Sequence, residues 1–223
     1  MPEDTLASRR ATEIARAYFD HPTDPKPKYD ESDSWGVDDE SWAFREKLEA
    51  WIEFFGHFDR YAAPYSFSQV DQGLWVIASV EGPLRDDLID PYGADPDYPL
   101  AVALFLSMPR MYTHYLIEAQ DAPELAFHMW WDCLAFPAAR LEKGEFSDLG
   151  TTSVRDAHLA ALEVILATDD SHCQYCALQG LGHLEHPRRA AVVTQFIESE
   201  REAGRLDGWR IEWLEECRDG TVM

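Results

Sequence analysis

The chain has 223 residues, of which 46% are hydrophobic and 13% aromatic, so it has enough apolar material for one sizeable core. Its 42 acidic residues outnumber 19 basic residues, and the formal net charge of -23 disfavours direct binding to nucleic acid or to an anionic membrane surface. The same charge favours solubility, or encounter with a cationic protein partner.

Two amphipathic segments near the N-terminus predict helices. Apolar residues recur on one helical stripe over 5–19, and an aromatic-rich face extends through 41–61. Between them, 21–39 has the proline, aspartate and serine content of an exposed loop.

A third helix is expected to begin after Ser66 or Ser68, because a serine side chain can accept a hydrogen bond from the first turn. The apolar run 74–77 within it also suits a buried strand. The following segment, 81–97, holds three prolines and six acidic residues against one arginine. It therefore marks the boundary between two lobes.

The second half of the chain predicts a series of helices. We expect one over 100–120, kinked at Pro109, and another over 124–136 that Pro137 ends. Helices starting near residues 153, 171 and 188 then follow at a nearly constant spacing, and the last covers 209–217. A repeated spacing of this kind is typical of a solenoid-like stack.

The pattern of caps and helices over 151–204, with the inner segment CALQGLG at 176–182, resembles HEAT-type helical repeats. The segments MWWD at 129–132 and QGLGHL at 179–184 are also similar to a group of uncharacterised bacterial helical proteins. The resemblance implies an all-α fold of stacked antiparallel helices, with a HEAT-like array in the C-terminal part. It also implies a surface that binds other proteins.

We expect a single helical domain over 1–223, with 1–80 and 98–223 as its lobes. The acidic first residues, 1–4, do not suit a secretory signal, and the apolar windows 100–108 and 154–167 do not suit the ~20-residue span of a bilayer. The predicted compartment is the cytoplasm. The spacing of the four cysteines is not that of a disulfide framework, so reduced thiols are expected.

Cys173, Cys176, His183 and His186 form a C-x2-C-x6-H-x2-H string, which has the ligand types of a tetrahedral zinc site. In a continuous helix the first and last of them lie roughly 20 Å apart, so a metal site requires a break near 180–182, where two glycines permit one. The apolar face across the run favours a structural role instead. We therefore expect no metal, with these four residues as the only candidates.

The sequence also bears on redox chemistry and on the common enzyme classes. The pair Cys173 and Cys176 has the spacing of a redox motif, but such a motif follows a strand, and none is predicted there. Phosphate-binding loops, G-x-S-x-G elbows and H-E-x-x-H motifs are missing from the sequence, which disfavours the common enzyme classes. We expect neither a catalytic residue nor a cofactor.

Trp130 and Trp131, beside Asp132, form an aromatic cluster that could line a ligand pocket. At helical spacing such rings are more often part of the core. The alternative function is therefore a small-ligand or zinc-binding enzyme with a pocket near these tryptophans and the 173–186 helix.

The leading hypothesis is a non-enzymatic, acidic, protein-binding protein of bacterial origin. In its more specific form, this hypothesis is an immunity or antitoxin-type inhibitor of a basic toxin domain, because negative charge would steer the chain onto a cationic surface. The candidate partner-binding residues are acidic: Asp38, Asp39, Glu40, Asp86, Asp87, Asp90, Glu212, Glu215 and Glu216.

Overall fold

The computed structural model describes residues 5–23, 36–37, 41–79, 82, 84, 98–118, 125–141, 148–206 and 208–222, and every regular element within these ranges is a helix. The all-α prediction is confirmed. The α-helices are α1 (Leu6–Phe19), α2 (Phe44–Gly56), α3 (Phe58–Ala62), α4 (Phe67–Ala78), α6 (Tyr98–Ser107), α7 (Leu125–Leu141), α8 (Asp148–Leu166), α9 (Ser171–His183), α10 (Arg189–Glu202) and α11 (Gly208–Asp219).

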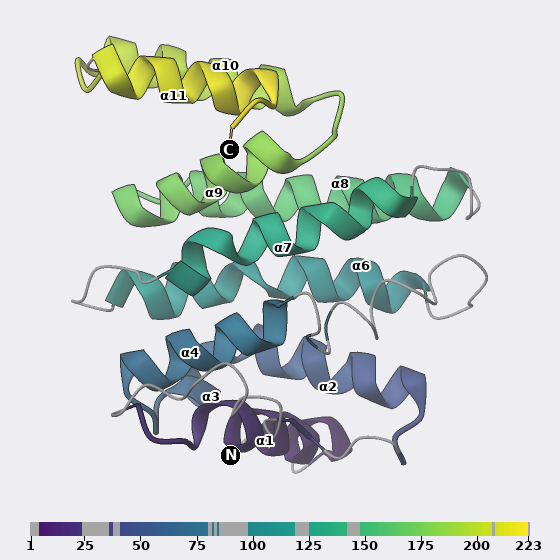
Figure 1. Ribbon diagram of the computed structural model, residues 1–223. Coiled ribbons are helices and arrows are strands. Elements are labelled where there is room, and N and C mark those ends of the chain that lie inside the picture. Colours follow the sequence, from purple (N-terminus) through teal and green to yellow (C-terminus); the bar gives the residue numbers. More distant parts are fainter. Residues whose placement is uncertain are drawn as a thin grey trace.

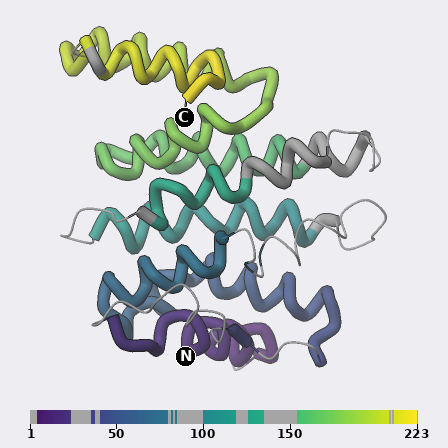
Figure 2. The backbone as a smooth tube through the Cα atoms, viewed as in Figure 1, coloured from purple at the N-terminus to yellow at the C-terminus, as the bar shows by residue number. Residues whose placement is uncertain are grey.

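The helices lie in successive layers from α1 at one end to α10 and α11 at the other (Figures 1 and 2). Their contacts define two columns. In the first, α2 packs on α6 and α6 on α8; in the second, α4 packs on α7, α7 on α9, and α9 on α11. Helix α1 covers the starts of both columns by packing on α2 and α4. The HEAT-like relationship of this stack stays a prediction.

One hydrophobic core connects the layers, with buried residues from Ala11 in α1 to Val222 near the C-terminus. Helices α2 and α4 of the 1–80 region pack directly on α6 and α7 of the 98–223 region. Among the described helices, none combines the length and the apolar character that a membrane span needs.

Three helix starts follow from local side-chain chemistry. The hydroxyl of Thr5 accepts from the Ser8 amide at 3.1 Å, and the carboxylate of Asp170 accepts from the Cys173 amide at 2.8 Å. Ser66 caps α4 with a reciprocal hydrogen bond from its own amide to the Gln69 side chain at 3.0 Å. Residues 74–77 are helical, so the strand alternative is wrong.

Several predicted boundaries are wrong. The helix expected over 41–61 is interrupted at His57, whose φ of -134° is not helical. The helix expected over 100–120 ends at Ser107, and a π-helical turn, Met111–Tyr115, and a 3-10 turn, Leu116–Glu118, follow it.

Two further boundaries differ. Helix α7 continues past Pro137 to Leu141, because a proline removes one backbone hydrogen bond without preventing later residues from continuing the helix. Helix α8 begins at Asp148, one turn before the caps expected at 151–153.

Candidate functional site

Helix α9 is continuous from Ser171 to His183 and contains both glycines of the candidate metal segment. Each glycine lies at a close approach between helices. A Cβ on Gly180 would overlap Trp131 of α7 and Leu162 of α8, and a Cβ on Gly182 would overlap Val222. The glycines therefore serve helix packing, and the break that a metal site requires does not occur.

The two cysteines of α9 face separate partners in the interior. The thiol of Cys173 donates to the carbonyl of Tyr112 at 3.6 Å, and the sulfur of Cys176 lies 3.3 Å from Nδ1 of His128. Burial raises the pKa of the Cys173 thiol to about 12 and that of Cys176 well above its ordinary value. Both are therefore neutral thiols at neutral pH, and neutral thiols are poor nucleophiles.

The two histidines also point to different partners. Nε2 of His183 lies 3.3 Å from the Asp132 carboxylate, and Nε2 of His186 lies 2.9 Å from that of Asp156 on α8. Nδ1 of His186 accepts from the Arg188 amide at 3.1 Å.

The four candidate ligands therefore do not converge. Within the described ranges, the structure places no three His, Cys, Asp or Glu side chains where they could share a metal ion.

His128 and Asp132 of α7 meet Cys176, Gln179 and His183 of α9 along one polar strip, which we call the α7–α9 seam. The amide nitrogen of Gln179 lies 3.4 Å from Asp132 and 3.2 Å from Nε2 of His183. Burial raises the pKa of Asp132, although the nearby His183 acts in the opposite direction. The seam joins two packed helices through polar contacts, but Oδ1 of Asp132 is buried without a hydrogen-bond partner among the described residues.

Trp130 and Trp131 belong to the core, since both have an exposed fraction of 0%. The ring of Trp131 lies 6.1 Å from Tyr112 and 4.9 Å from His158, centroid to centroid. These tryptophans therefore do not line an open pocket, as the alternative function requires.

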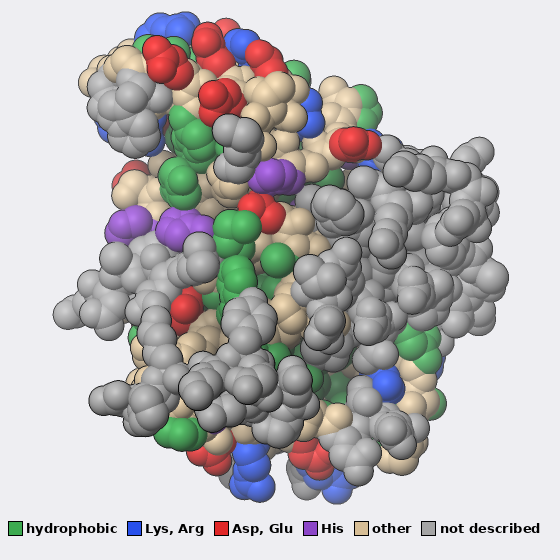
Figure 3. All heavy atoms as spheres, in the orientation of Figure 1, with side chains coloured by type: hydrophobic (Ala, Val, Ile, Leu, Met, Phe, Trp, Pro, Cys, Tyr) green, Lys and Arg blue, Asp and Glu red, His purple; other side chains and the backbone are tan. Residues whose placement is uncertain are grey.

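Three of the candidate partner-binding acids are described, and all three are exposed on α11: Glu212, Glu215 and Glu216. Their spacing of i, i+3 and i+4 places them on one face of the helix. Figure 3 shows acidic and basic side chains side by side over this end of the stack. The remaining candidates lie outside the described residues: Asp38, Asp39, Glu40, Asp86, Asp87 and Asp90.

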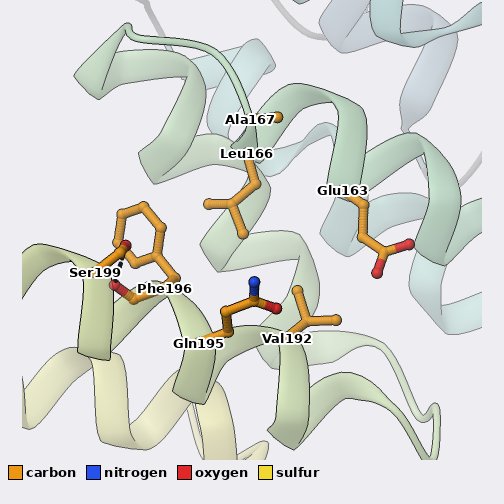
Figure 4. Close-up of a pocket in the computed structure, with 7 residues that line it drawn as sticks. All are labelled: Glu163, Leu166, Ala167, Val192, Gln195, Phe196 and Ser199. Carbon is orange, nitrogen blue, oxygen red and sulfur yellow. Dashed lines mark hydrogen bonds between the residues drawn. The ribbon is translucent and has the colours of Figure 1, made fainter.

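A groove between α8 and α10 was not among the predicted sites. Its volume is about 320 Å³, and Figure 4 shows Leu166 of α8 directed toward Val192 and Gln195 of α10. The groove is lined by Glu163, Leu166, Ala167, Val192, Gln195, Phe196 and Ser199. The one sequence feature that indicates this groove is the apolar run AAVV at 190–193, which is wider than one face of a helix.

The chain was compared with protein-family models, curated proteins and solved structures. None of them matches. Function must therefore be argued from the chain's own surface and interior.

Proposed function

We propose that the chain is a non-enzymatic protein that binds a basic protein partner through its acidic surface. The observation that supports the proposal best is the exposed face of α11, which carries Glu212, Glu215 and Glu216 at the end of the stack. In the described part of the chain, Glu212 and Glu216 have no ion-pair partner, and Glu215 has only a distant contact with Arg218 at 3.9 Å. Their charge is available to a partner.

Glu200 of α10 is an acidic residue with a structural role, and it differs from the acids of α11. It is 2% exposed and forms ion pairs with Arg205 and Arg210, and hydrogen bonds from Arg205 lower its pKa. The acids on α11 lack this enclosure. A surface that leaves acids unneutralised favours encounter with a cationic protein and accelerates it at low salt.

The most specific form of the proposal is an immunity-type inhibitor that covers the cationic surface of a toxin domain. A stacked helical surface of this kind suits protein binding, and the net charge of -23 suits a basic partner. The chemistry of α9 agrees, because the buried thiols of Cys173 and Cys176 are not activated as nucleophiles.

Capture from the native cell tests the proposal. Immobilised wild-type chain is compared with Glu212→Lys/Glu215→Lys/Glu216→Lys, and with a control that makes the same charge change elsewhere, Glu185→Lys/Glu198→Lys/Glu202→Lys, at positions that are also exposed. We expect a basic protein that the wild type and the control retain and the α11 variant loses. Equal retention by all three, or retention of acidic proteins only, would contradict the proposal.

The immunity role has its own test. The captured protein is expressed alone and together with the wild-type chain or the α11 variant. Growth arrest that the wild type relieves and the variant does not relieve supports an inhibitor. A captured partner without toxicity would remove the immunity role and leave the binding function.

A further inference from the structure

The two columns of the stack differ in continuity at their C-terminal end. In the second column α11 packs on α9, as α9 packs on α7. In the first column α8 packs on α6, but among the described residues α10 packs mainly on α9 and α11, and the groove lies between α10 and α8. The groove therefore lies where continuation of the first column would need closer packing between α8 and the next helix.

The floor of the groove is apolar and its rim is polar. Leu166, Val192 and Phe196 supply aliphatic and aromatic surface from two helices, and Ala167, which directly follows α8, also lines the groove (Figure 4). Gln195, which is exposed, adds a polar side chain to the lining. An apolar floor with a few polar groups at its rim is the usual composition of a groove that receives side chains.

Glu163 places a carboxylate on this rim, where it holds an arginine of the chain itself. Nη2 of Arg188 lies 2.8 Å from Oε1 of Glu163, and the two side chains are 62% and 35% exposed. An ion pair this exposed contributes little to folding stability. An arginine from a partner can therefore replace Arg188 at this carboxylate at small cost.

We propose that the α8–α10 groove receives an amphipathic helix of the basic partner. Its apolar side chains lie on Leu166, Val192 and Phe196, and an arginine or lysine pairs with Glu163. This inference rests on the proposed function and adds the place and the chemistry of docking. The occupant is basic because the groove's one charged lining residue is an acid and the chain as a whole carries a net charge of -23.

The test uses a fluorescein-labelled 16-residue peptide with leucines at helical i, i+3, i+4 and i+7 spacing and arginines elsewhere. Its binding to the full chain is measured by fluorescence anisotropy. Ala167→Trp fills the groove from an exposed position, and Val164→Trp adds the same ring to α8 at a position that is 53% exposed and does not line the groove. Glu163→Gln removes the rim charge, and exposed Glu198→Gln is its control.

We expect Ala167→Trp to weaken peptide binding by about tenfold or more and Glu163→Gln by about threefold, with both controls within about twofold of the wild type. Circular dichroism confirms that all variants are folded. Equal affinity for Ala167→Trp, Val164→Trp and the wild type would overturn the groove as the docking site. A wild type that does not bind the peptide in low salt would also overturn it.

Failure of the groove and failure of the proposed function give different results. If the captured basic partner still depends on the α11 acids but ignores Ala167→Trp, only the docking site is wrong. If no basic partner is captured, the proposed function fails whatever the peptide does.

Discussion

Gly180 of α9 lies against Trp131 of α7 so closely that a methyl group in its place would overlap the tryptophan side chain. This contact shows that the Cys/His segment of α9 packs against α7 and does not break to form a metal site. The segment is helical through both glycines, and its cysteines and histidines each contact a different partner along its length.

The first prediction concerns this contact. Gly180→Ala gains up to about 1 kcal/mol of helix propensity but must displace Trp131 or Leu162, which costs about 1–3 kcal/mol. We expect a lower urea midpoint for the variant. Gly56→Ala is the control, because the nearest atom to its new Cβ is 4.0 Å away, and we expect it to be neutral or slightly stabilising. A Gly180→Ala protein as stable as Gly56→Ala would show that the packing is looser than described.

The second prediction concerns His158, which is fully buried between Phe105 and Trp131 and has ring nitrogens without hydrogen-bond partners in the described structure. Burial lowers its pKa to about 3, so the folded protein keeps the ring neutral while the unfolded chain takes up a proton below about pH 6.5. Above that pH the ring is neutral in both states, so His158 does not make the free energy of unfolding depend on pH. Stability then falls as the pH decreases toward 3, by at most about 1.4 kcal/mol per unit.

Urea unfolding at pH 7.5 and at pH 5 measures this effect. His158→Leu removes the titrating ring at similar volume, so we expect a smaller loss of stability on acidification than in the wild type. Exposed His57→Gln is the control and should keep the wild-type loss. The account of His158 is contradicted if the leucine variant and the wild type lose equal stability.

The third prediction concerns Arg189, which binds the ends of two helices. Its Nη1 donates to the carbonyl of Leu184 at 3.0 Å, and its Nε donates to that of Arg218 at 3.3 Å. Hydrogen bonds from a charged donor are worth about 1.5–3 kcal/mol each, so Arg189→Met should loosen α11 from α9. Faster amide hydrogen exchange in α11 is the expected readout. Arg188→Met removes only an exposed ion pair and should leave this exchange unchanged.

The fourth prediction separates buried thiols from accessible ones. Cys173, Cys176 and Cys217 are buried, whereas Cys133 is of intermediate exposure. Burial also raises the pKa of Cys217 to about 12. We expect a thiol reagent at pH 8 to modify Cys133 first and the others only on unfolding, as peptide mass mapping would show. Rapid labelling of Cys173 or Cys176 in the native protein would revive the redox interpretation.

The features that the sequence predicts well are local. Ser66 and Asp170 cap helices through hydrogen bonds to amides three residues away, so their roles depend on neighbouring residues alone. Apolar periodicity predicts the number and order of most helices for the same reason. The exposed acids of α11 follow directly from the pattern of that helix.

The features that could not be predicted from the sequence depend on contacts between residues far apart in the chain. Whether Gly180 breaks α9 or packs it closely depends on Trp131, which lies on another helix. The α8–α10 groove exists because α10 packs mainly on α9 and α11 instead of continuing the column that ends at α8, and periodicity within either helix does not report that arrangement. The π-helical turn after Pro109 likewise has no local pattern that sets it apart from a kinked helix.

The salt dependence of binding to the captured partner tests the central claim most directly. If an acidic surface binds a basic protein, the association rate constant of the wild-type chain should fall by about tenfold or more between low salt and roughly 0.3 M salt. The Glu212→Lys/Glu215→Lys/Glu216→Lys variant should start slower and fall less. An association rate that does not change with salt in the wild type would contradict the account.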